Sequence, residues 1–254
     1  MSKFFIGTSG WVYSSWDKVF YPEDLPYKEK LKYFSKHFKT AEVNYSFYRL
    51  PRPETFKNWK NQVPDDFVFS VKASRYITHI KRLKGAEEPT EKFINNAKNL
   101  GQKLGPILFQ LPPSFKINLE RLEKFLKILP KKYRFTFEFR HKSWFTKETF
   151  DLLKKYKVAL CIADSPGYPK EIRATSSFVY IRMHGSKRLF SSKYTKKELQ
   201  DLAKLIKKFL KEGKDVYTYF NNDAFGYAVE NAREIREMMS YKKVKTEKFK
   251  LGNQ

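Results

Sequence analysis

Cysteine is almost absent from this sequence: the 254 residues include one, Cys161, inside the apolar run VALCIA. A single cysteine cannot form an intramolecular disulfide, which fits a reducing compartment, and we expect it to be a small buried side chain. No stretch approaches the ~20 apolar residues that a membrane-spanning helix needs. The apolar run in the N-terminal segment MSKFFIGTSGW is too short for a signal peptide. We therefore expect a soluble, cytoplasmic protein without a membrane partner.

Several catalytic signatures are also missing. GTSGW after the first apolar run is not the GxGxxG loop of dinucleotide-binding folds, and no P-loop, nucleophile elbow or Ser–His–Asp order occurs. The four histidines show no HxH or HExxH spacing, so we expect no dedicated metal cluster. No cofactor is evident. A single Mg²⁺ held by Glu138, Asp164 and substrate phosphates remains open.

Acidic residues are few compared with basic ones. The sequence has 27 Asp and Glu against 52 Lys and Arg, a net charge of +25. Such an excess favours polyanions, because phosphate contacts release bound counterions. A lysine-rich proteome is the alternative, although glutamate normally rises with lysine there. Composition favours a polyanion partner and leaves the alternative open.

Strand-like and helix-like segments alternate along the whole chain. Eight runs are typical of strands: 3–9, 40–45, 67–72, 106–111, 134–139, 158–164, 178–184 and 215–221. Amphipathic patterns predict helices at 27–38, 53–61, 90–100, 118–129, 146–156, 195–211 and 224–238. This alternation predicts an α/β fold, a single (β/α)8 TIM-type barrel over residues 1–240. Residues 241–254 are basic and weakly patterned, and we predict a C-terminal tail there.

Polar residues gather on one face of these strands near their C-terminal ends. Phe135, Phe137 and Phe139 alternate with Glu138 and Arg140, so the phenylalanines should face the helices and the charged residues the interior. The same phase places further residues at the barrel mouth: Glu42, Asn44, Lys72, Gln110, Asp164, Arg182, His184, Tyr219 and Asn221. Barrel enzymes place active sites at this end, so we interpret the set as a candidate site.

Seven ordered segments resemble a known family. They are GTSGWVYSSWDKVFYP (7–22), EVNYSFYRLP (42–51), FSVKASRYITH (69–79), LFQLPPSF (108–115), EFRHKSW (138–144), YIRMHG (180–185) and YFNNDAFGYAVENA (219–232). Together they span almost the whole chain and resemble the family catalogued as domain of unknown function 72, the YecE/YunF-like proteins. The resemblance implies a single TIM-type barrel and carries no established reaction. A suggested likeness of the family to endonuclease IV-like barrels is an analogy only.

The leading hypothesis is a phosphate-bearing ligand at the mouth, with nucleic acid as one such ligand and phosphodiester hydrolysis as one reaction. Lys72, Arg140 and Arg182 would hold the anion, and Glu138 would serve as the base. The residues that would orient the substrate are Asn44, Gln110 and Asn221. Loops 184–194 and 220–228 follow strands seven and eight, the usual phosphate position in such barrels. His184 and Asn222 belong to these loops, whereas Asp223 is expected to cap the following helix.

Two other functions stay open. A carbohydrate-active barrel would use Glu42 and Glu138 as its carboxylate pair, with aromatic rings as a sugar platform. A non-catalytic nucleic-acid-binding protein would depend on surface lysines instead. The rings that either ligand could stack on are Trp11, Tyr13, Trp16, Phe47, Tyr48, Trp144 and Tyr219.

The structural alternative is that the charged residues only pair with one another. Glu138 with Arg182 is the obvious example, holding adjacent strands in register. Burying such pairs is costly and often gains little stability, so we favour a functional site. The aromatic rings have the corresponding alternative of closing the top of the barrel.

Overall fold

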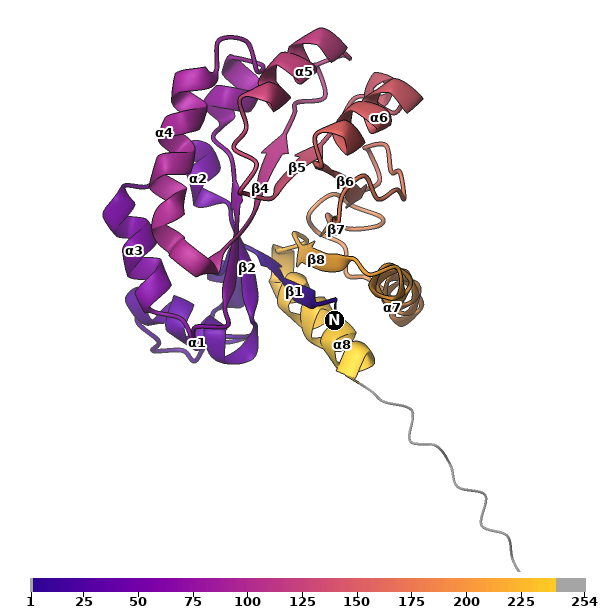
Figure 1. Ribbon diagram of the computed structural model, residues 1–254. Helices are drawn as coiled ribbons and strands as arrows, with labels where there is room; N and C mark the ends of the chain where they lie inside the picture. The colour runs from indigo at the N-terminus through magenta and orange to yellow at the C-terminus, as the bar shows by residue number, and fades with distance from the viewer. Residues whose placement is uncertain (1, 241–254) are drawn as a thin grey trace, which may run out of the picture.

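Eight parallel strands close into one barrel in chain order in the computed structural model of the protein, which describes residues 2–240 (Figure 1). The strands are β1 Phe4–Ser9, β2 Thr40–Val43, β3 Val68–Lys72, β4 Leu104–Gln110, β5 Phe135–Glu138, β6 Ala159–Asp164, β7 Phe178–Met183 and β8 Asp215–Phe220. The predicted (β/α)8 fold is confirmed. The tail predicted at 241–254 lies outside the described residues.

Helices surround the barrel on its outer side (Figure 1). They are α1 Lys30–His37, α2 Tyr45–Tyr48, α3 Pro53–Asn61, α4 Glu87–Ala97, α5 Leu119–Lys127, α6 Lys147–Lys155, α7 Lys196–Lys211 and α8 Tyr227–Ser240. Residues 165–177, which connect β6 to β7, contain no helix. No helix within residues 2–240 has both the length and the apolar character needed to cross a membrane.

The core has two layers, one inside the barrel and one between strands and helices. The inner layer contains Cys161, Tyr180 and Tyr219. The outer layer contains Phe135, Phe137 and Phe139, and Phe137 stacks on Phe109 of β4 with 5.2 Å between ring centroids. The alternation of apolar and polar residues therefore predicted the two faces of β5 correctly, and Glu138 faces the interior.

The predicted orientation of Asp164 is wrong. Cys161 belongs to the inner layer, whereas Leu160 and Ile162 belong to the outer one, and Asp164 shares their phase. The Asp164 carboxylate lines an outer cavity of about 520 Å³ between β6, β7 and α7 and pairs with Lys170 at 2.9 Å. Every residue from Ala159 to Ala163 is buried, so an alternating pattern is not visible in this strand.

The end of β2 also differs from the prediction. The expected strand 40–45 ends at Val43, and Tyr45 starts the short helix α2. Asn44 has helical backbone angles, with φ −93° and ψ −24°. Tyr45 therefore lies in the loop region above the barrel, and its side chain is 51% exposed.

Gly7 is required where β1 passes β2. A Cβ atom on Gly7 would lie 2.1 Å from the backbone oxygen of Thr40, so Gly7→Ala forces two neighbouring strands apart. We expect a loss of about 1–3 kcal/mol in the free energy of unfolding, measured by chemical denaturation. Gly167→Ala is the matched control, because its added Cβ would have no neighbour within 4 Å. Equal stability of the two variants would contradict the close approach.

Candidate ligand-binding site at the barrel mouth

Four charged residues form a continuous ion-pair network inside the mouth. Arg182 donates from Nη2 to Glu42 Oε1 at 2.8 Å and from Nη1 to Glu138 Oε2 at 2.6 Å. Arg140 donates from Nε to the other oxygen of Glu138 at 2.7 Å. The second oxygen of Glu42 accepts from the Tyr180 hydroxyl at 2.7 Å. All four carboxylate oxygens therefore have a donor.

This network keeps both glutamates ionised. Burial raises both pKa values, and the charge of Arg182 opposes it. Hydrogen bonds from Ser9 and Tyr180 add to this effect at Glu42, so its pKa is lowered. The charges of Arg140 and His184 add to it at Glu138, whose pKa lies well below its usual value. Glu42 and Glu138 have no exposed surface, and Arg182 has 1%. The structure brings these predicted residues together, but as the paired network that the sequence left open as an alternative. Neither carboxylate suits a general base, and Arg182 has no surface for an anion.

Other predicted ligand-binding residues are buried, and their polar groups form hydrogen bonds with other protein side chains. The Tyr219 hydroxyl lies deep in the barrel, 2.7 Å from Thr40 Oγ1 and 2.8 Å from Ser70 Oγ. His184 is fully buried, and Asn221 Nδ2 lies 2.9 Å from its Nδ1. The predicted position of Tyr219 at the mouth is therefore wrong.

Asn222 and Gln110 are also withdrawn from solvent. Asn222 donates to the backbone oxygen of Ser192 at 2.9 Å and to Asn231 Oδ1 at 3.1 Å. It thereby ties the loop after β7 to α8 and does not point into the mouth. Gln110 is 3% exposed, with its Nε2 atom 3.5 Å from His79 Nε2.

The predicted ligand pair for Mg²⁺ does not converge. Glu138 faces the interior of the barrel, and Asp164 faces the helices. Within residues 2–240, no three His, Cys, Asp or Glu side chains come together as a metal-binding group.

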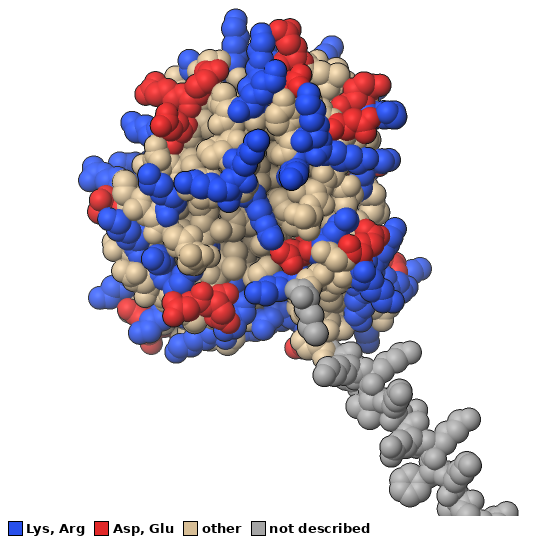
Figure 2. Space-filling model, viewed as in Figure 1, with Lys and Arg blue, Asp and Glu red and all other residues tan. Residues whose placement is uncertain are grey.

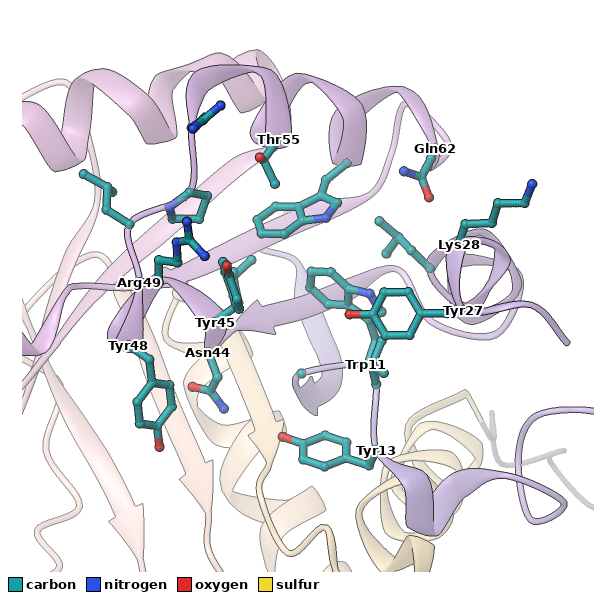
Figure 3. Close-up of a pocket in the computed structure, with 18 residues that line it drawn as sticks. Trp11, Tyr13, Tyr27, Lys28, Asn44, Tyr45, Tyr48, Arg49, Thr55 and Gln62 are labelled. Atoms are coloured by element: carbon teal, nitrogen blue, oxygen red, sulfur yellow. The ribbon is translucent and has the colours of Figure 1, made fainter.

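A pocket of about 940 Å³ opens beside the mouth, between the loop after β1, α2 and α3 (Figure 3). In Figure 3, Thr55 of α3 and Gln62, which follows this helix, lie above the pocket, and Tyr13 and Asn44 lie below it. Six aromatic side chains line it: Trp11, Tyr13, Tyr27, Tyr45, Tyr48 and Trp59. A volume of this size is typical of a ligand site.

The charged residues of this pocket are all basic. Lys28, Arg49 and Arg52 line it, and no Asp or Glu does. All three are exposed, and none has an ion-pair partner within residues 2–240. Asn44 adds a polar group: its Nδ2 atom donates to Ser9 Oγ at 2.6 Å, while its buried Oδ1 atom has no partner in the described part of the chain. Of the predicted polar site residues, Asn44 alone lines this pocket, and three of the predicted aromatic rings, Trp11, Tyr13 and Tyr48, line it as well.

The exposure of the tyrosines is unusual for such large rings. Tyr27 is 75% exposed, Tyr45 51% and Tyr48 72%. In contrast, Trp16, Phe47, Trp144 and Tyr219 are buried and offer no ring face to a ligand. The rings of Trp11 and Trp59 meet edge to face at 5.3 Å and form the pocket wall.

Sequence reasoning missed Tyr27, Tyr45, Arg49, Arg52 and Trp59 as members of the site. The available signal was the stretch NYSFYRLPRP, 44–53, which places two tyrosines and two arginines between a strand and a helix. Pro53 at the first position of α3 ends this connection. Because α2 is only four residues long, its tyrosines cannot all pack on the barrel.

Asp223 lies at the same end of the barrel, after β8. It does not cap the following helix, contrary to the prediction, because its side chain accepts no capping hydrogen bond. Burial raises the pKa of Asp223 to about 8, and Glu42 acts in the same direction against Tyr13 and Arg182. Its Oδ1 atom is buried without a partner within residues 2–240.

Positive charge is spread over the whole face of the molecule that is visible in Figure 2. Figure 2 shows Lys and Arg distributed over the whole visible face, with Asp and Glu in smaller groups between them. The pocket is therefore distinguished by the absence of acidic side chains and by its rings, since basic residues occur all over this face.

Comparison with known proteins agrees with the fold and the sequence motifs. The UPF0759 protein YunF of Bacillus subtilis is 26% identical over 268 residues, covering 92% of this chain and 94% of that protein. A crystal structure of a DUF72 family protein from Thermotoga maritima has a TM-score of 0.86 at 30% identity, covering 94% of this chain and all of that one. D-psicose 3-epimerase from Clostridium cellulolyticum shares the fold alone, with a TM-score of 0.58 at 12% identity over 93% of this chain and 98% of that one. The model of the family described as protein of unknown function DUF72 matches residues 5–252, and the chain belongs to this family.

Proposed function

We propose that the protein binds single-stranded nucleic acid, with one base in the aromatic pocket and the adjoining phosphates on its basic residues. The observation that carries the proposal is the lining of this pocket, which combines six aromatic rings with Lys28, Arg49 and Arg52 and contains no acidic residue. Aromatic rings stack on every base, and cations hold the backbone. The net charge of +25 favours the same class of partner.

Single-stranded nucleic acid suits the geometry better than a duplex. The exposed rings of Tyr45 and Tyr48 lie at the edge of a concave pocket, where an unpaired base has access to them. A paired base inside a duplex offers no free face for stacking. Arg49 and Arg52 follow α2 directly, in the connection to α3, and line the same pocket as these rings.

The proposal covers binding and does not include hydrolysis, because the carboxylates predicted for that reaction are not available to a substrate. Glu138 is fully buried between Arg140 and Arg182. The Glu42–Glu138 pair expected for a carbohydrate-active enzyme is separated by the Arg182 guanidinium in the same way. Neither glutamate has a free oxygen to offer a substrate.

Replacing Tyr48 tests the stacking part of the proposal. We expect Tyr48→Ala to weaken binding of a fluorescent single-stranded oligonucleotide by about 5- to 150-fold, because a base–aromatic stack contributes about 1–3 kcal/mol. Fluorescence anisotropy measures the dissociation constant, and Tyr48→Phe, which keeps the ring, should bind as the unchanged protein does. Equal loss in Tyr48→Phe and Tyr48→Ala would contradict stacking.

The salt dependence tests the phosphate contacts. Removing two of them with Arg49→Ala and Arg52→Ala should reduce the slope of log K against log salt by about 1.4 between about 50 and 200 mM salt. Lys207→Ala with Lys211→Ala is the matched control, since it removes two exposed charges from α7, on another side of the barrel (Figure 1). If this control changes the slope as much, binding follows the net charge and the pocket proposal is wrong.

A further inference from the structure

Lys72 places an amine at the mouth of the barrel. It is the last residue of β3 and follows the inward phase of Ser70, whose hydroxyl lies 2.8 Å from that of Tyr219 inside the barrel. The Nζ atom lies over the ring of Phe47, 4.0 Å from its centroid. The residue retains 9% of its surface. The amine is therefore largely buried, against the face of an aromatic ring.

Lys72 differs from the other buried lysines in its lack of a partner. Lys30 pairs with Asp17 at 2.5 Å. Lys103 donates to the backbone oxygens of Lys60 and Val63 at 2.9 and 2.7 Å. Lys72 has no acidic partner in salt-bridge range and no side-chain hydrogen bond within residues 2–240. Burying an ammonium group without a partner costs free energy. An apolar side chain would pack equally well at this position without that cost.

The surroundings favour the neutral amine. Burial, followed by the charge of Arg182, lowers the pKa of Lys72 to about 7. Arg140 acts in the same direction, and Glu138 and Glu42 oppose it. Near neutral pH, roughly half of the amine is then unprotonated and nucleophilic. Desolvation and neighbouring cations are the two means by which proteins activate lysine as a nucleophile.

Two neighbours complete a site for a carbonyl compound. Arg140 keeps part of its guanidinium at the mouth, where it stacks over Tyr168 at 4.4 Å and can hold an anionic group. The ring of His79 packs edge to face against the ring of Phe47, with 5.0 Å between their centroids. Burial and the charge of Lys72 lower the pKa of His79 to about 4, so the ring is neutral near pH 7 and can accept a proton.

We propose that Lys72 is a nucleophile that forms an imine with an aldehyde or ketone carrying an anionic group. The lone pair of Nζ adds to the carbonyl carbon, and one amine proton passes to the carbonyl oxygen to give the carbinolamine. The second amine proton then leaves with the hydroxyl group as water, and the C=N bond of the imine forms. No oxidant or reductant takes part. This activity goes beyond nucleic-acid binding and does not depend on the aromatic pocket, because Lys72 and Arg140 do not line it.

Reductive trapping tests the proposal on the full chain. Glycolaldehyde phosphate is added together with sodium cyanoborohydride, which reduces the imine to a stable secondary amine, and peptide mapping by mass spectrometry locates the adduct. At about pH 7, we expect Lys72 to be labelled about 10- to 100-fold faster than any exposed lysine. Its labelling rate should rise through about pH 7 and then level off, whereas the rate of an ordinary lysine keeps rising to about pH 10. Neutral glycolaldehyde should label Lys72 more slowly, and equal rates would contradict the part assigned to Arg140.

Lys30 and Lys103 serve as internal references, because they are buried and have partners. Labelling of Lys72 no faster than these residues or the exposed lysines would overturn the proposal. Lys72→Met should abolish the fast phase, and a fast phase that persists in this variant would also overturn it. Should the variant fail to fold, the peptide map of the unchanged protein decides alone. If the unchanged protein shows fast labelling of Lys72 but binds no oligonucleotide, only the proposed function is refuted. If it binds the oligonucleotide but Lys72 is not labelled faster than other lysines, only imine formation is refuted.

Discussion

Replacing Arg182 by methionine is expected to destabilise the protein by about 3–5 kcal/mol, because it leaves two buried carboxylates without their shared partner. Arg182 bonds to both Glu42 and Glu138, and neither glutamate has exposed surface to recover hydration. For a chain of this size, the loss corresponds to a melting temperature lower by roughly 10 °C, measured by calorimetry or circular dichroism.

Two further variants separate charge from packing. Adding Glu42→Gln and Glu138→Gln to Arg182→Met removes the uncompensated charges, and we expect it to recover much of the loss. Arg134→Met is the surface control: Arg134 pairs with Asp215 at 2.8 Å with its side chain 43% exposed, so its loss should cost no more than about 1 kcal/mol. If Arg182→Met and Arg134→Met have the same melting temperature, the ion-pair network does not stabilise the barrel.

Asp223→Asn is expected to stabilise the protein at pH 8 and to change how its stability depends on pH. The pKa of Asp223 is raised to about 8 in the folded protein from an ordinary value of 3.8. The folded state therefore retains a proton that the unfolded state releases, and the stability that this proton contributes is fully present below about pH 4. It is lost as the pH rises towards 8, by up to about 1.4 kcal/mol for each pH unit.

The variant removes this dependence because asparagine does not titrate. We expect Asp223→Asn to exceed the unchanged protein in free energy of unfolding by an amount on the order of a few kcal/mol at pH 8, with little difference at about pH 4. Urea denaturation at several pH values measures both. The exposed Asp201→Asn serves as control, and a difference that stays constant with pH in the Asp223 variant would contradict the raised pKa.

The fold was predictable because it depends on local patterns that repeat along the chain. Alternation of Phe135, Phe137 and Phe139 with polar residues defines both a strand and its two faces, so the inward direction of Glu138 followed directly. The same reasoning failed for Asp164, because β6 is apolar on both faces and its phase had to be chosen without an alternating pattern.

The site was only partly predictable, since charge state and exposure depend on tertiary contacts. The inward direction of Arg182 was predicted correctly. Its simultaneous ion pairs with Glu42 and Glu138 could not be predicted, because they depend on how three separate strands come together. Trp11 and Trp59 meet in the pocket although 47 positions separate them in the sequence. Periodicity also carries no information on α2, whose exposed tyrosines define the pocket edge, because a single helical turn has no repeat.

The connection from β6 to β7 has a consequence for how this barrel can diversify. Residues 165–177 contain no helix, yet Tyr168 in this segment contacts Arg140 at the mouth. Insertions or deletions here would alter what reaches the rim without displacing a packed helix from the wall. Selectivity for new small molecules can therefore evolve through this loop while the eight strands stay unchanged.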